Sequence, residues 1–185
     1  MKTIEDLKIT DLDKLAHDSE YFDCEFIGLD LRDVNLSGCI FNDSIFKSCN
    51  LSNVSLTNSS LSEISFKNCK MLGFNFNTLR SINNLKFYDS NLSFCILNSM
   101  KIRDVEFINC KLDDSDFSEG KFESISFEKS KLSGVNFSNS NLLNCNFSLA
   151  SDYYIDPRFT RIKGSTFSMP EALSLLNSFE IKIDS

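Results

Sequence analysis

The chain has 185 residues, of which 42% are hydrophobic, so it can bury the core of one domain. Its net charge of −7 gives no bias toward nucleic acid or anionic membranes, and no apolar run approaches the length of a membrane span. The acidic opening residues do not resemble a signal peptide, and the seven cysteines form no C-x-x-C pair, so we expect a cytoplasmic protein.

The opening segment, residues 1–21, lacks the regular pattern that follows it. Its three lysines are outnumbered by acidic residues. We expect this segment to form an N-terminal cap, because a stack of repeats needs its first layer covered. The only histidine, His17, lies here and is predicted to be a surface residue.

From residue 22 to residue 149, a bulky apolar residue occurs at every fifth position. Eleven such positions run from Phe26 to Phe76 and, after one extra residue, fourteen more run from Ile82 to Phe147. A helix would spread these side chains around its circumference, and a strand would alternate them between two faces. A chain that turns a corner every five residues instead points all of them into a four-sided tube.

Four sides of five residues give a 20-residue coil, so residue types should recur at that interval. Every fourth apolar position is in fact a phenylalanine. This column is the predicted structural core: Phe26, Phe46, Phe66, Phe87, Phe107, Phe127 and Phe147. The column stays in phase across the extra residue within 77–81, so we predict a local bulge with Leu79 facing inward and Arg80 facing outward.

All seven cysteines lie two residues before one of these apolar positions. They are Cys24, Cys39, Cys49, Cys69, Cys95, Cys110 and Cys145. This place faces a tight corner, where a free thiol behaves as a small buried hydrophobe. Inert core is therefore the favoured prediction, and a metal site or a disulfide is the alternative.

These five-residue units make the chain resemble the pentapeptide-repeat proteins. Their consensus of small–polar–Leu/Phe–polar–polar is met by CNLSN, SKLSG, VNFSN and CKLDD. The resemblance covers residues 22–149 and implies an all-β solenoid, a right-handed quadrilateral parallel β-helix of about six coils.

Residues 150–185 are predicted to be a C-terminal capping and dimerisation module. In the stretch 168–176, Ser168 is placed as a helix N-cap, with Pro170 in the first turn and Glu171 after it. The apolar residues that follow either cap the last coil or pair with a second copy. Residues 154–183 also resemble the C-terminal module of the Qnr and microcin-immunity proteins, which dimerises tail to tail. The resemblance favours a homodimer, with the interface at Leu173, Leu176, Phe179, Ile181 and Ile183.

The sequence offers little chemistry. His17 has no credible catalytic or metal-binding partner, and there is no glycine-rich phosphate loop. We expect no enzyme activity, no cofactor and no metal.

The resemblance implies a protein-binding rod that mimics DNA and protects DNA gyrase or topoisomerase IV, without binding nucleic acid or membranes itself. DNA carries about one charge per 1.7 Å of its axis. Residues 24–147 hold 12 basic and 14 acidic residues, which is far less dense. We therefore expect a smaller acidic patch to bind the partner: Asp104, Glu106, Asp113, Asp114, Asp116, Glu119 and Glu123. The alternative function is a general protein-interaction scaffold unrelated to topoisomerases.

Overall fold

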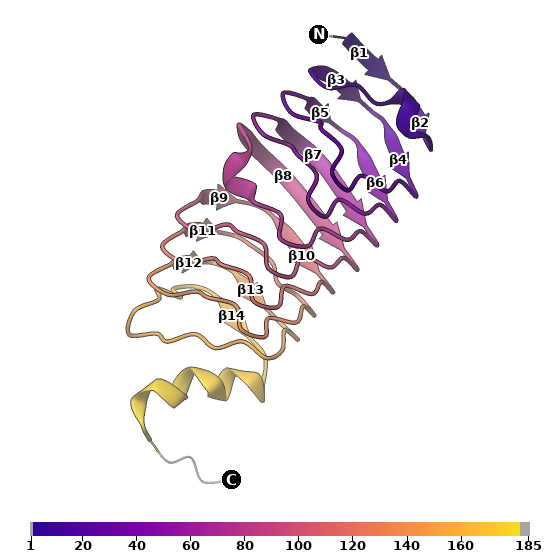
Figure 1. Cartoon of the computed structure of the whole chain (residues 1–185). Helices are drawn as coiled ribbons and strands as arrows, with labels where there is room; N and C mark the ends of the chain where they lie inside the picture. The colour runs from indigo at the N-terminus through magenta and orange to yellow at the C-terminus, as the bar shows by residue number, and fades with distance from the viewer. Residues whose placement is uncertain (1, 182–185) are drawn as a thin grey trace.

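The computed structural model describes residues 2–181, which form a stack of coils with the two chain ends at opposite ends of the stack (Figure 1). Strands of successive coils pair in parallel, which confirms the predicted parallel β-helix. Among residues 2–181, the largest sheet has nine strands, a second has three and a third has two.

The elements are short, as expected for a chain that turns every five residues. The first nine are β1 (Lys2–Glu5), β2 (Lys8–Ile9), η1 (Leu12–Lys14), β3 (Ser19–Phe22), β4 (Glu25–Ile27), β5 (Ile40–Asn42), β6 (Ile45–Lys47), β7 (Ser60–Lys67) and η2 (Phe76–Thr78). The remaining eight are β8 (Ser81–Tyr88), β9 (Lys101–Arg103), β10 (Glu106–Ile108), β11 (Lys121–Glu123), β12 (Asn141–Leu143), β13 (Asn146–Phe147), β14 (Thr166–Phe167) and η3 (Glu171–Phe179). The three η elements are 3₁₀ helices.

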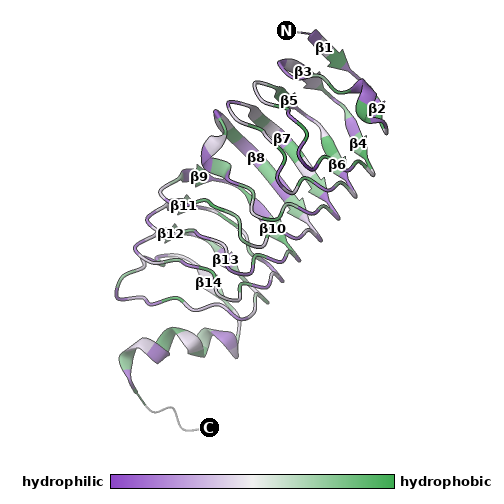
Figure 2. Ribbon diagram, viewed as in Figure 1, coloured by the Kyte–Doolittle hydropathy of each residue, from purple (hydrophilic) through white to green (hydrophobic). Residues whose placement is uncertain are grey.

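The predicted phenylalanine column forms the centre of the core. All seven of its side chains are at most 1% exposed, and consecutive rings stack with centroids 4.3–5.6 Å apart. The column is longer than predicted, because Ile9 pairs with Phe26 before it and Phe167 pairs with Phe147 after it. The stack therefore has about eight turns and not about six. Figure 2 shows that hydrophobic and hydrophilic residues alternate along each coil.

The two extra coils escaped prediction because each departs from the regular repeat. In the first coil, Ile4 pairs with Tyr21, an interval of 17 residues where later coils take 20 or 21. The expected N-terminal cap thus continues the ladder while covering the first phenylalanine. In the last coil, residues 152–160 are irregular before pairing resumes.

The single inserted residue lies where the sequence indicates. The Asn58 N–H donates to the carbonyl oxygen of Thr78, an interval of 20, whereas Ser60 pairs with Ser81, an interval of 21. The extra residue is therefore accommodated at Leu79 and Arg80. Leu79 packs against the core and Arg80 is exposed, as predicted.

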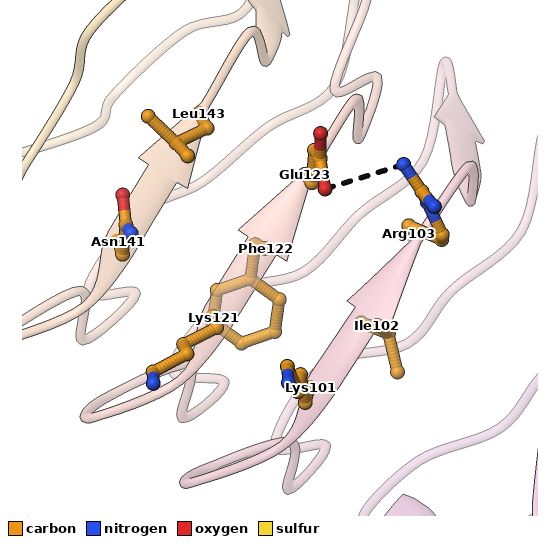
Figure 3. Close-up of a pocket in the computed structure, with 8 residues that line it drawn as sticks. All are labelled: Lys101, Ile102, Arg103, Lys121, Phe122, Glu123, Asn141 and Leu143. Atoms are coloured by element: carbon orange, nitrogen blue, oxygen red, sulfur yellow. Dashed lines mark ion pairs between the residues drawn. The ribbon is translucent and has the colours of Figure 1, made fainter.

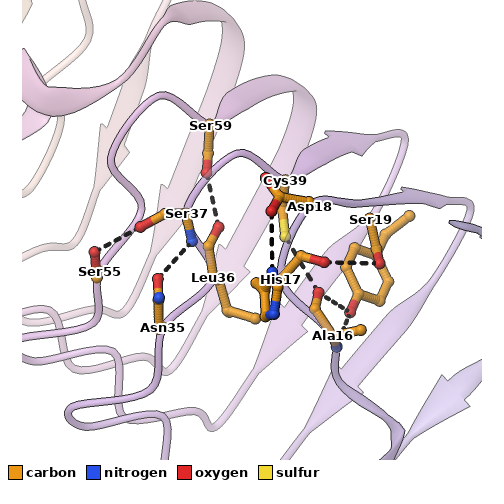
Figure 4. Close-up of polar contacts among 11 residues, drawn as sticks. Ala16, His17, Asp18, Ser19, Asn35, Leu36, Ser37, Cys39, Ser55 and Ser59 are labelled. Carbon is orange, nitrogen blue, oxygen red and sulfur yellow. Dashed lines mark hydrogen bonds and ion pairs between the residues drawn. The ribbon is translucent and has the colours of Figure 1, made fainter. Parts of the chain in front are cut away.

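Where the residue two places before an apolar position is serine or cysteine, its side chain can connect two coils at a corner. The Ser59 hydroxyl donates to the Leu36 carbonyl at 2.8 Å, and the Cys39 thiol donates to the Ala16 carbonyl at 3.4 Å (Figure 4). Aliphatic residues such as Val54 and Ile64 also occupy this place, so it accepts buried apolar groups as well as small donors. A cysteine is small and apolar and can also donate, which explains why all seven cysteines occur here.

The C-terminal helix differs in detail from its prediction. It spans Glu171–Phe179 with Pro170 at the N-cap position, and no side chain caps it. Ser168 was predicted to be the cap, but its hydroxyl accepts a hydrogen bond from the Leu149 N–H at 3.1 Å. Ser168 thus ties the start of the module to the last regular coil. Of the helices within residues 2–181, none is long and apolar enough to cross a membrane.

Candidate partner-binding surfaces

The interior of the stack is filled by side chains, and its cysteines face inward. All seven cysteines are free and buried. Burial raises the pKa of both Cys95 and Cys110 to about 12, so these thiols stay protonated at neutral pH. Among residues 2–181, no group of histidine, cysteine or acidic side chains is arranged to hold a metal ion. Candidate function therefore lies on the outer walls.

The seven acidic residues expected to form one patch are distributed around the whole tube. Residues 104–123 make one complete lap, passing the inward residues Phe107, Leu112, Phe117 and Phe122 in turn. Their side chains therefore face four different sides, so the structure does not bring them together.

Several of these carboxylates also have cationic neighbours. Arg103 lies 3.4 Å from Asp104 and 3.3 Å from Glu123. Lys86 is 3.8 Å from Glu106, and Lys111 is 3.2 Å from Asp113. Within residues 2–181, no ion pair involves the other three members, Asp114, Asp116 and Glu119.

A different row of carboxylates follows one corner of the stack. At almost every corner the residue two places after an apolar position has positive φ, a conformation that favours glycine, asparagine and aspartate. At the corner that precedes the phenylalanine column, four successive coils place an acid there. We call Asp6, Asp23, Asp43 and Glu63 the acidic corner.

The carboxylates of the acidic corner are exposed and regularly spaced. Main-chain hydrogen bonds from Asp6 to Phe22 and from Asp23 to Asn42 hold successive coils in register. Neighbouring strands lie about 4.8 Å apart, so the row has about one negative charge per 4.8 Å. One strand of DNA has one per 3.4 Å. The other three corners have no such run of acids, since they carry Asn, Ser and Gly between isolated charges.

Sequence reasoning missed the acidic corner because it summed charges over whole sides. The last place of every fourth pentapeptide reads Asp23, Asp43 and Glu63, a pattern that the sequence itself displays. The membership of Asp6 cannot be read in the same way, because it depends on the short first coil.

The predicted dimer residues on and beyond η3 present an apolar surface. Leu173 and Leu176 are each 36% exposed, Phe179 is 50% exposed and Ile181 is 56% exposed. Ile183 lies outside the described residues. A dimer interface at these positions stays a prediction.

Comparison with known proteins identifies the repeat. The family described as "Pentapeptide repeat region" matches residues 19–92, 80–147 and 100–169. Comparison with curated protein sequences gave no match. Two structures of trypsin-treated variants of QnrB1, a plasmid-mediated fluoroquinolone resistance protein, are similar to this chain. The first has 20% identity, a TM-score of 0.64 and coverage of 100% of this chain and 99% of the other. The second has 17% identity, a TM-score of 0.66 and coverage of 99% and 98%.

Proposed function

Because the chain belongs to the pentapeptide-repeat family, we propose that it is a non-enzymatic, DNA-mimicking rod that binds and protects DNA gyrase or topoisomerase IV. The observation that carries this proposal is the acidic corner. A row of fixed carboxylates on a rigid edge resembles the charge pattern of one DNA strand, and an enzyme groove built to bind phosphates attracts it electrostatically. The likeness of fold to a fluoroquinolone resistance protein along the full chain supports the same proposal.

The charge distribution favours a binding mode through one edge of the rod. Residues 24–147 are nearly balanced in charge, so the whole surface does not imitate DNA. The acidic corner concentrates four negative charges on the coils nearest the N-terminus. We infer that these coils enter the DNA groove of the enzyme, and that the exposed apolar face of η3 pairs two copies at the other end.

A cleavage assay with purified gyrase, DNA and ciprofloxacin tests the proposal. We expect the wild-type protein to lower the amount of cleaved DNA. The combined variant Asp23→Asn, Asp43→Asn and Glu63→Gln should be about tenfold less potent, because three corner charges are lost. Asparagine tolerates positive φ, so the aspartate replacements should keep the fold.

A matched control removes the same number of negative charges from another part of the surface. The variant Asp113→Asn, Asp114→Asn and Asp116→Asn also removes three carboxylates, and it should keep the wild-type potency. If the second variant loses potency and the first does not, the partner-binding residues are those expected from the sequence. No effect of the wild-type protein on gyrase or topoisomerase IV would instead support a general interaction scaffold.

A further inference from the structure

A groove crosses the outer surface of the sheet formed by β9, β11 and β12. Its volume is about 360 Å³. Two rows of side chains form its walls, and the floor between them is the strand backbone at Ile102 and Phe122 (Figure 3). We call the wall residues the channel: Lys101, Lys121 and Asn141 in one row, and Arg103, Glu123 and Leu143 in the other.

The channel carries positive charge that the rest of the protein does not neutralise. Lys101 and Lys121 are register partners on adjacent strands, so their backbones lie about 4.8 Å apart and both side chains project from the same face (Figure 3). Neither has an ion-pair partner within residues 2–181. Like charges placed directly opposite each other are destabilising. An anion bound between the two lysines would relieve this repulsion.

The positive charge is confined to the later coils of this side. Asn141 pairs with Arg161, which extends the lysine row by a third cation. The equivalent places on β7 and β8 are occupied by Ser60 and Ser81. The ladder is also interrupted at this point, because no strand pairing joins β8 to β9 in the described part of the chain. On this side of the stack the cations are thus confined to the later coils, while another side has a separate groove lined by Lys47 and Lys67.

The channel also contains an acceptor that lacks a donor. The Oδ1 atom of Asn141 is buried and has no hydrogen-bond partner among residues 2–181, and a buried acceptor without a partner is costly. A peptide supplies an N–H at almost every residue, whereas the phosphodiester backbone supplies only acceptors. A nucleic acid carries a charge at every residue, so Glu123 and the net charge of −7 oppose it more than they oppose a peptide whose few carboxylates lie at the lysines.

We propose that the channel binds an extended acidic peptide segment of a partner protein. Carboxylates of the peptide pair with Lys101 and Lys121, and small apolar side chains contact Leu143. The Asn141 amide turns outward on binding, so that its Oδ1 accepts a hydrogen bond from a main-chain N–H of the peptide. This interaction uses a different surface from the acidic corner and does not depend on a topoisomerase partner.

Fluorescence anisotropy with a rhodamine-labelled, alternating Glu-Val octapeptide tests the proposal. We expect saturable binding, no binding of the Gln-Val analogue, and weaker binding of a labelled single-stranded oligonucleotide. The double variant Lys101→Glu and Lys121→Glu should reduce the affinity at least about tenfold and flatten its dependence on salt. The variant Asn141→Ala should reduce the affinity about threefold and leave the salt dependence unchanged, because it removes an acceptor and no charge.

The matched control is the double variant Lys47→Glu and Lys67→Glu. These lysines are also register partners on adjacent strands, β6 and β7, and they lie outside the channel. We expect this variant to bind the peptide as the wild type does. An equal loss in both double variants, tighter binding of the oligonucleotide, or no binding of the Glu-Val peptide would overturn the proposal. Circular dichroism of each variant verifies that the fold is retained.

Discussion

Each place in the five-residue unit has a different physical requirement at the residue scale. The apolar residue fills the tube, and the residue two places earlier is buried at a corner, where serine or cysteine also donates a hydrogen bond to the neighbouring coil. The residue two places later adopts positive φ in almost every unit. These requirements explain why the repeat tolerates variation at the remaining places. The acidic corner uses this freedom, because aspartate satisfies the backbone and also provides a charge.

The phenylalanine column predicts a large loss of stability when one ring is removed in the middle of the stack. Phe87 stacks on Phe66 at 4.8 Å and on Phe107 at 5.0 Å. Phe87→Ala should lower the free energy of unfolding by about 3–5 kcal/mol, because the rigid coils cannot collapse onto the cavity. Urea unfolding measures this change. Phe94 is 57% exposed, so Phe94→Ala is the control and should change stability by less than about 0.5 kcal/mol. Equal effects of the two variants would contradict the assignment of the core.

The buried thiols predict a loss of stability at alkaline pH. Burial raises the pKa of Cys95 and of Cys110 from the ordinary value of about 9.0 to about 12. Below pH 9 the thiol is protonated in both states and contributes no pH dependence. Between that pH and about 12, only the unfolded chain releases the proton. The free energy of unfolding should then fall by up to about 1.4 kcal/mol per pH unit for each thiol.

Urea unfolding at about pH 8 and about pH 10 measures this effect. The control is the double variant Cys95→Ser and Cys110→Ser, since serine occupies the same place at Ser115 and Ser130. The variant should lose less stability than the wild type over this interval. An identical loss in the two proteins would contradict the burial of the thiols.

At the scale of single elements, the coil is the unit that sequence predicts well. Periodicity placed the inward residues, the cysteines and the bulge at Arg80, because each depends on contacts repeated in every coil. Prediction from periodicity failed in the first and last coils and at Ser168, because the structure there depends on single contacts that are not repeated in other coils. The Ser168 hydroxyl bonds to Leu149 and not to its own helix, and no local motif encodes that partner.

The exposed face of η3 predicts a dimer. Leu173, Leu176 and Phe179 are each at least 36% exposed, and burying them against a second copy would remove apolar surface from water. Light scattering after gel filtration should give twice the chain mass of 21.0 kDa. The double variant Leu173→Glu and Phe179→Glu should give the single mass, and Phe94→Glu, on a distant coil, should remain dimeric. A wild-type mass of 21.0 kDa at high concentration would exclude the dimer.

At the scale of the whole molecule, function depends on how charges line up across coils. The charged residues can all be read from the sequence, but their alignment across coils cannot be seen from the net charge of each side of the tube. The acidic corner and the channel were therefore missed. Both surfaces are made by residues about 20 positions apart that the stacking brings within one strand spacing. The set from Asp104 to Glu123 illustrates the reverse case, since acids close in sequence are separated around the tube.

The direct test of the central claim is competition between this protein and DNA for gyrase. A labelled DNA duplex is bound to the enzyme, and its anisotropy is followed as the unlabelled protein is added. We expect the wild-type protein to displace the duplex, and the variant Asp23→Asn, Asp43→Asn and Glu63→Gln to need about tenfold more protein for the same displacement. A duplex that stays bound at saturating wild-type protein, or equal displacement by the two proteins, would contradict the claim that the acidic corner acts as a DNA mimic.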